Sequence, residues 1–137
     1  MRPVAKSSLW LGHVGDIHDL RAVLAAGILA VVDLALEEPP ATVTRELVYC
    51  RFPLLDGIGN PPWLLRAAVD CVAGLLHSCT PSLVYCSNGM SRSPAIAAAA
   101  IARVRGCSPA EALELVAEPG PADVSPALWA EAQAVLS

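Results

Sequence analysis

The segment from Ser82 to Val104 constrains the fold of this chain more than any other. It begins with an apolar run, Ser82 to Tyr85, of the kind that forms a buried β-strand. After a short turn comes a helical stretch from Ser93 or Pro94 to about Val104. That stretch is so rich in alanine that we expect neighbouring elements to approach it closely on most sides. A strand that leads directly into a buried helix is typical of α/β folds, in which helices pack against a largely parallel sheet.

The rest of the sequence supplies more elements of both kinds. Apolar and β-branched runs predict strands, and helical spacing with capping residues at the start predicts helices. The expected strands are 8–11, 29–34 and 47–52, and the expected helices are 16–26, 63–77, 109–117 and 127–136. We therefore predict a single domain over residues 1–137, with a central, mostly parallel sheet of about four to five strands flanked by helices.

Composition narrows the possible partners. Of the 137 residues, 55% are hydrophobic and 16% are charged, and the net charge is −4. No tract of Lys or Arg is present that could attract a nucleic acid or an anionic membrane surface. No signal peptide is recognisable, and the most apolar run, 94–102, is too short to span a bilayer. We expect a soluble, cytoplasmic protein that binds neither nucleic acid nor membrane; its oligomeric state is left open.

The cysteines give no framework for a metal or for disulfides. The chain has five, with no Cys-x-x-Cys pair and no metal-ligand spacing, so we expect free thiols, no metal site and no cofactor. Cys50, Cys71 and Cys107 lie in apolar contexts typical of small buried side chains. Redox regulation through one of these, or through Cys79, is left open.

The turn after the strand at 82–85 carries the residues that indicate chemistry. Cys86 lies at the end of the strand and Arg92 lies at the start of the helix, with Gly89 between them. Backbone amides of such a turn, with the positive end of the helix dipole, bind a tetrahedral anion and favour a thiolate. Arg92 can grip two oxygens of a phosphate, and Ser93 can donate a hydrogen bond to the sulfur. The predicted phosphate-binding residues are Ser87, Asn88, Gly89, Met90, Ser91 and Arg92.

The stretch Tyr85-Cys86-Ser87-Asn88-Gly89-Met90-Ser91-Arg92-Ser93 resembles the Cys-x5-Arg-Ser/Thr signature loop of cysteine-dependent protein phosphatases. It is most similar to that of the small dual-specificity phosphatases. Further segments are similar to landmarks of that family in the same order, so that the resemblance covers about residues 8–135. These segments are Ser8-Leu9-Trp10-Leu11-Gly12, Val32-Asp33-Leu34-Ala35 and Pro53-Leu54-Leu55-Asp56-Gly57.

The resemblance implies a metal-free, two-step hydrolysis of phosphomonoesters. Cys86 would attack phosphorus, and Asp56, on a Pro/Gly-rich loop, would protonate the leaving oxygen and then activate water. Arg92 would stabilise the phosphoryl oxygens. The implied substrates are phosphorylated proteins or small phosphomonoesters, with phosphotyrosine and phosphoserine or phosphothreonine residues both accepted. Because Arg92 is the only basic residue of the loop, phosphoinositides and RNA triphosphates fit less well.

One departure from the family pattern keeps open the alternative of a phosphate-binding module, and a second alternative stands beside it. The family usually has a histidine before the nucleophile, whereas this chain has Tyr85, which has no cationic form near neutral pH. We therefore expect weaker stabilisation of the Cys86 thiolate than a histidine would provide. The alternatives are a phosphate-binding module with little turnover and the thiol chemistry of rhodaneses or arsenate reductases.

Overall fold

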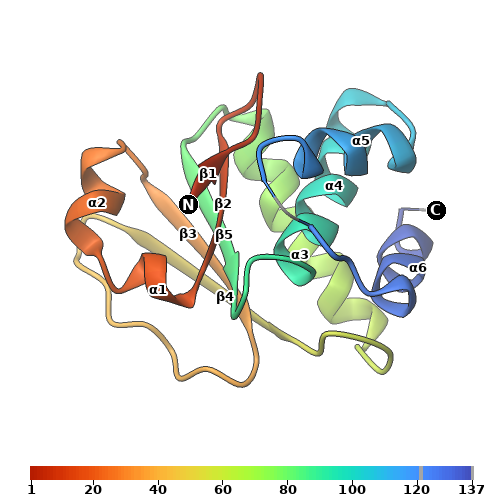
Figure 1. The fold of residues 1–137 in the computed structure, drawn as a ribbon, viewed down its shortest axis with the longest axis horizontal. Helices are drawn as coiled ribbons and strands as arrows, with labels where there is room; N and C mark the ends of the chain where they lie inside the picture. The colour runs from red at the N-terminus through yellow and green to blue at the C-terminus, as the bar shows by residue number, and fades with distance from the viewer. Residues whose placement is uncertain (121, 137) are drawn as a thin grey trace.

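The computed structural model describes residues 1–120 and 122–136. Figure 1 shows a central sheet with helices on both sides. The strands are β1 (Arg2–Pro3), β2 (Leu9–His13), β3 (Ala30–Ala35), β4 (Val48–Leu54) and β5 (Ser82–Cys86). The helices are α1 (Val14–Ile17), α2 (Leu20–Ala25), α3 (Pro62–His77), α4 (Arg92–Arg105), α5 (Pro109–Ala117) and α6 (Pro126–Ala134).

The five strands form one mostly parallel sheet in the order β1-β2-β5-β3-β4. Only β1, which was not predicted, runs antiparallel to its neighbour β2. The strand β5 lies in the middle and pairs in parallel with both β2 and β3, and all five of its residues are buried. The predicted α/β fold with four to five strands is confirmed. Because the carboxyl ends of parallel strands meet at one edge of the sheet, that edge is the expected place for a binding site.

The two faces of the sheet are covered by different helices. Figure 1 shows α1 and α2 on one face and α3 to α6 on the other. Each face has its own buried apolar cluster, with Cys86 in the one beneath α3 to α6 and Tyr85 in the other. Adjacent residues of a strand point to opposite faces, so the nucleophile candidate and the unusual tyrosine beside it are separated by the sheet.

Helix α4 is the most buried helix, as its alanine content predicted. Its first eleven residues, Arg92 to Ala102, are all buried. Methyl side chains let α4 lie close to the sheet and to α3, α5 and α6 at the same time. The helix ends at Gly106, whose φ of 68° lies in the left-handed region that favours glycine. This dense packing fixes the first turn of α4, which carries Arg92 and Ser93.

The predicted helix from Asp16 to Ala26 is wrong in its boundaries. The strand β2 continues to His13, whose imidazole Nδ1 accepts a hydrogen bond from the Gly15 amide (3.0 Å) and so caps α1. Asp16 lies inside α1, and its carboxylate accepts a bond from the His13 amide (2.9 Å). The Asp19 carboxylate then caps a second helix, α2, by accepting a bond from the Ala22 amide (3.2 Å). A capping aspartate competes with a continuous helix at that point, which splits the segment into α1 and α2.

Candidate active site

A small cleft opens at the carboxyl end of β5. Its volume is about 130 Å³. Its lining comes from the turn between β5 and α4, from the loop after β4 and from the segment before α6; the lining residues are Asp56, Cys86, Asn88, Met90, Ser91, Arg92 and Asp123. The cleft therefore brings together three of the four predicted catalytic residues, Cys86, Arg92 and Asp56.

Cys86 lies at the base of this cleft and is almost fully buried, with 2% of its surface exposed. Its Sγ lies 3.4 Å from the Oγ of Ser93, which is wholly buried in the first turn of α4. A hydroxyl at this distance can donate to a thiolate and lower its energy. The sulfur is thus accessible only from the cleft, with a hydrogen-bond donor beside it.

The turn that follows Cys86 needs its glycine. Gly89 has a φ of 72°, which strains any other residue, and a Cβ there would lie 2.7 Å from the carbonyl oxygen of Gly12 on β2. The Arg2 guanidinium donates a hydrogen bond to the Gly89 carbonyl (2.9 Å) from the outside. The turn is therefore held between β1, β2 and α4.

Arg92 is buried and is held by several acceptors. Its Nη1 donates to the Leu54 carbonyl (2.8 Å) and to the Oε2 of Glu37 (2.8 Å), and its Nη2 donates to the other oxygen of Glu37. The bonds to these residues occupy three of the five N–H groups of a guanidinium. The Nε–H and one Nη2–H are left to grip an anion in the cleft.

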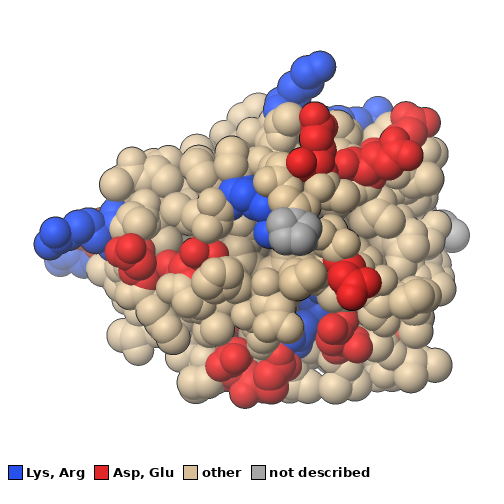
Figure 2. All heavy atoms as spheres, in the orientation of Figure 1, with Lys and Arg blue, Asp and Glu red and all other residues tan. Residues whose placement is uncertain are grey.

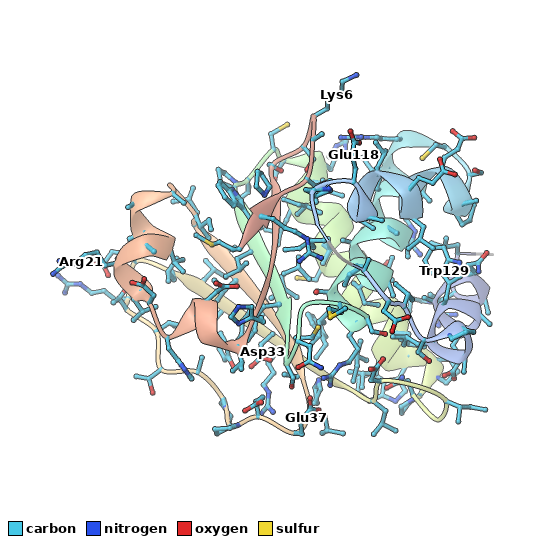
Figure 3. The ribbon with its side chains drawn as sticks, viewed as in Figure 1. Lys6, Arg21, Asp33, Glu37, Glu118 and Trp129 are labelled. Atoms are coloured by element: carbon cyan, nitrogen blue, oxygen red, sulfur yellow. The ribbon has the colours of Figure 1, made fainter. Side chains whose placement is uncertain are left out.

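The partner of Arg92, Glu37, was not predicted as a site residue. It follows β3, and Figure 3 shows it at the edge of the sheet where β5 also ends. Hydrogen bonds from Arg92 lower the pKa of Glu37 from 4.5 to about 2, against the effect of partial burial, and the Ser87 hydroxyl adds a further bond. Burial alone would lower the pKa of Arg92, but its bonds to Glu37 raise it above the ordinary value. Both groups are therefore charged at neutral pH.

The loop after β4 carries Asp56 to the cleft. The Ser91 hydroxyl donates to the Oδ1 of Asp56 (2.5 Å) and accepts a bond from the Ser125 amide (2.9 Å). Within the loop, the Asn60 amide group bridges the Leu55 backbone, accepting from its N–H (2.7 Å) and donating to its carbonyl (2.9 Å). Asp56 is thus already at the cleft, on a loop that buried Asn60 holds in shape.

The other residues predicted to bind phosphate are placed in two ways. Asn88, Met90 and Ser91 contribute to the lining of the cleft. Ser87 and Gly89 are not part of the lining, and the Ser87 hydroxyl donates to Glu37. Asp123, which sequence reasoning missed, joins the lining because its backbone amide donates to the Met90 carbonyl (2.7 Å). No local motif marked Asp123 or Glu37, because each reaches the cleft only through tertiary packing.

Tyr85 lies on the other face of the sheet and does not line the cleft. It is buried beside Asp33 and Tyr49, and the Tyr49 hydroxyl donates to the Asp33 carboxylate (2.5 Å). Burial, and then the negative charge of Asp33, raise the pKa of Tyr85 far above its ordinary value. Tyr85 is therefore neutral, and it can influence the Cys86 thiolate only through the backbone.

The remaining cysteines are free thiols. Cys50 on β4 and Cys71 on α3 are neighbours, and burial followed by the closeness of Cys50 raises the pKa of Cys71 to about 12. A thiol with that pKa stays protonated at neutral pH and reacts slowly. Within residues 1–120 and 122–136, no group of three His, Cys, Asp or Glu side chains could hold a metal ion, and no helix is long and apolar enough to cross a membrane.

Comparison with known proteins places this site in a family. No protein-family model matches the chain. The sequence is 30% identical to human dual specificity phosphatase 28 over an aligned length of 133 residues, and the match covers 92% of this chain and 72% of the relative. The crystal structure of human dual specificity phosphatase 28 has a TM-score of 0.86 at 26% identity, covering 99% of this chain and 95% of that chain. A mouse protein described as a dual specificity phosphatase, crystallised with zinc tungstate, has a TM-score of 0.85 at 26% identity over 98% of this chain and 84% of that chain.

The fold and the cleft, with a thiol, a guanidinium and a carboxylate around one small space, define a cysteine-dependent phosphohydrolase. More particularly, the chain belongs to the dual specificity phosphatases. The family resemblance seen in the sequence is confirmed.

Proposed function

We propose that this protein hydrolyses phosphotyrosine and phosphoserine or phosphothreonine residues through a phosphocysteine intermediate on Cys86, in the cytoplasm. The observation that carries the proposal is the meeting of Cys86, Arg92 and Asp56 around one cleft of about 130 Å³. The relatives named above are phosphatases, which supports turnover over the alternative of a phosphate-binding module. They also support phosphoryl chemistry over sulfur or arsenate chemistry.

In the first step the Cys86 thiolate attacks phosphorus from the base of the cleft. The S–P bond forms as the P–O bond to the substrate breaks, and Asp56, protonated at this stage, gives its proton to the leaving oxygen. The Ser91 hydroxyl, which bonds to Asp56 (2.5 Å), orients the carboxyl group for this transfer. The products of the step are the dephosphorylated residue and phosphocysteine.

In the second step water replaces the sulfur. The Asp56 carboxylate accepts a proton from a water molecule while the water oxygen bonds to phosphorus. The S–P bond breaks at the same time, which releases inorganic phosphate and the Cys86 thiolate. The Ser93 hydroxyl, 3.4 Å from Sγ, stabilises the departing thiolate. Arg92 and the amides of the turn hold the three non-bridging oxygens through both steps.

Two aspartates line the cleft, so the role of the acid can be tested with a matched pair of variants. We expect Asp56→Asn to lower kcat for aryl phosphates with poor leaving groups by about 10²–10⁴-fold and to matter less for p-nitrophenyl phosphate. Asp123→Asn changes the other aspartate of the lining and should lack this dependence on the leaving group. Equal leaving-group dependence in the two variants would remove Asp56 from its role as the acid.

A further inference from the structure

We infer that the cleft selects phosphoresidues in protein segments whose neighbouring side chains are large and apolar, and that it discriminates against neighbours that carry negative charge. This inference rests on the proposed function, and it concerns which substrates that function serves.

The size of the cleft makes its surroundings decisive. Its volume of about 130 Å³ is well below the roughly 300–1,000 Å³ of ordinary small-molecule pockets. That space holds a phosphoryl group and the first atoms of the leaving group. Everything else on a substrate must lie against the surface around the mouth of the cleft, so the side chains at the mouth determine which substrates bind well.

Large apolar side chains are exposed on the segment that carries Asp56. Leu55 is 43% exposed, Ile58 is 79% exposed and Trp63, at the start of α3, is 68% exposed. Met90, which contributes to the lining of the cleft, is 36% exposed. Single exposed apolar residues are ordinary, but several on the two segments that bring Asp56 and Met90 to the cleft indicate a binding surface. We call Leu55, Ile58, Trp63 and Met90 the apolar rim.

The loop that presents most of this rim is preformed. Asn60 is only 4% exposed, and its side-chain amide bonds to the Leu55 backbone in both directions (2.7 and 2.9 Å) and to the Gly57 carbonyl (3.3 Å). Asp56, which lies between Leu55 and Gly57, accepts a hydrogen bond from the Ser91 hydroxyl. A surface that is already ordered loses little conformational entropy when a substrate covers it, so its apolar area contributes to affinity.

Charge around the cleft disfavours anions beyond the one phosphate. Asp56 and Asp123 line the cleft, and the charge of Arg92 is balanced by Glu37. Among the described residues, Arg92 is the only Lys or Arg in the lining. Figure 2 shows acidic side chains at several points on the lower part of this face, where Figure 1 places the turn after β5. An acidic neighbour or a second phosphate would be repelled, as would an anionic lipid surface, which favours an apolar protein segment over a membrane.

The test uses phosphotyrosine peptides that differ only in the residues on both sides of the phosphotyrosine: leucine, serine or glutamate. We expect kcat/KM to be highest for the leucine peptide, about five- to tenfold above the serine peptide, and lowest for the glutamate peptide. Ile58→Ser and Trp63→Ser should each reduce the ratio of leucine to serine peptide, because they remove rim area. Leu29→Ser is the matched control: Leu29 is 53% exposed but lies before β3, at the opposite edge of the sheet, and the variant should leave the ratio unchanged.

A second readout separates this inference from the proposed function. Affinities of the three peptides for the Cys86→Ser variant report selection without turnover, and p-nitrophenyl phosphate hydrolysis by the wild-type protein reports turnover without flanking residues. Hydrolysis of p-nitrophenyl phosphate with equal affinities for all three peptides would overturn the inference alone. Absent hydrolysis with the ranked affinities intact would overturn the proposed function and uphold the selection. Faster hydrolysis of phosphatidic acid in anionic vesicles than of any peptide would also overturn the inference.

Discussion

At the scale of single residues, the orientation of Arg92 depends on a carboxylate outside the signature loop. Glu37 binds both terminal nitrogens of Arg92 and also accepts from Ser87, so one side chain joins the two ends of the turn between β5 and α4. Arg92 is therefore preorganised: its remaining N–H groups already face the cleft before a substrate binds. Glu37 is thus a positioning residue, and its loss should affect substrate binding more than the chemical step.

The first prediction tests that role. Glu37→Ala should raise KM for p-nitrophenyl phosphate by about five- to tenfold and lower kcat less. Arg92 keeps its bond to the Leu54 carbonyl but loses its two hydrogen bonds to the Glu37 carboxylate. Glu37→Gln should recover part of the loss, since its amide oxygen still accepts a bond from Arg92. Glu38→Ala, one residue further along, is the control and should behave like the wild type. An unchanged KM in Glu37→Ala would contradict the role.

The same residue predicts a pH dependence of stability. The pKa of Glu37 is about 2 in the folded protein, below the ordinary value of 4.5, because Arg92 hydrogen bonds favour its charged form. The ion pair therefore stabilises the fold fully above about pH 4.5, and the stabilisation disappears as the pH falls towards 2. The difference in Tm between wild type and Glu37→Gln should be greatest above pH 4.5 and shrink below it. The difference in Tm should be small, since Glu37 is half exposed. A difference in Tm that increased as the pH fell would contradict the ion pair between Glu37 and Arg92.

At the scale of elements, the turn between β5 and α4 depends on close contact with β2. A methyl group at Gly89 would lie 2.7 Å from the Gly12 carbonyl oxygen, at a backbone φ of 72° that already disfavours alanine. β2 is fixed by its pairing with β5, including Gly12 opposite Tyr85, so it cannot move away from the turn. Strain at Gly89 must therefore displace the turn and, with it, the amides that we propose as the phosphate-binding groups.

Gly89→Ala should accordingly lower both Tm and kcat/KM, the latter by more than tenfold. Gly74→Ala is the matched control, because Gly74 lies inside α3 and a Cβ there meets no atom within 4 Å. Alanine in a helix interior is favoured over glycine by about 0.5–1 kcal/mol, so this variant should be slightly more stable and equally active. The two Tm values and a kinetic comparison decide the matter: wild-type kinetics in Gly89→Ala would mean that the turn tolerates the displacement.

At the scale of the whole molecule, the sequence was most informative where local pattern and tertiary structure agree. The apolar run before Cys86 and the alanine-rich helix after it predicted the central strand, its neighbour α4 and the position of the cleft between them. The helix predicted from Asp16 failed because the caps at His13 and Asp19 outweigh its apolar spacing. Capping residues determine where a helix begins, but a segment with several possible capping residues does not show which of them is used.

The part of the site that could not be predicted comes from long-range packing. Glu37 is 55 residues from Arg92 along the chain, and Asp123 joins the cleft through a backbone bond to Met90. Neither residue belongs to a sequence motif, because its position in the site depends on tertiary contacts between segments that are distant in the sequence. Tyr85 illustrates the same limit. It lies beside Asp33 and Tyr49, on the face of the sheet opposite Cys86. The order of the strands determines these neighbours, and the position of Tyr85 before Cys86 in the sequence does not reveal them.

Rapid quenching tests whether Cys86 carries the phosphoryl group during turnover. We predict that p-nitrophenyl phosphate gives a burst of p-nitrophenol, and that mass spectrometry of the quenched protein finds a phosphate adduct on the peptide containing Cys86. Asp56→Asn should accumulate more of this adduct, because its hydrolysis needs the carboxylate as a base. Cys86→Ser should show neither burst nor turnover. Turnover that persists in Cys86→Ser, or an adduct on any other residue, would contradict the mechanism.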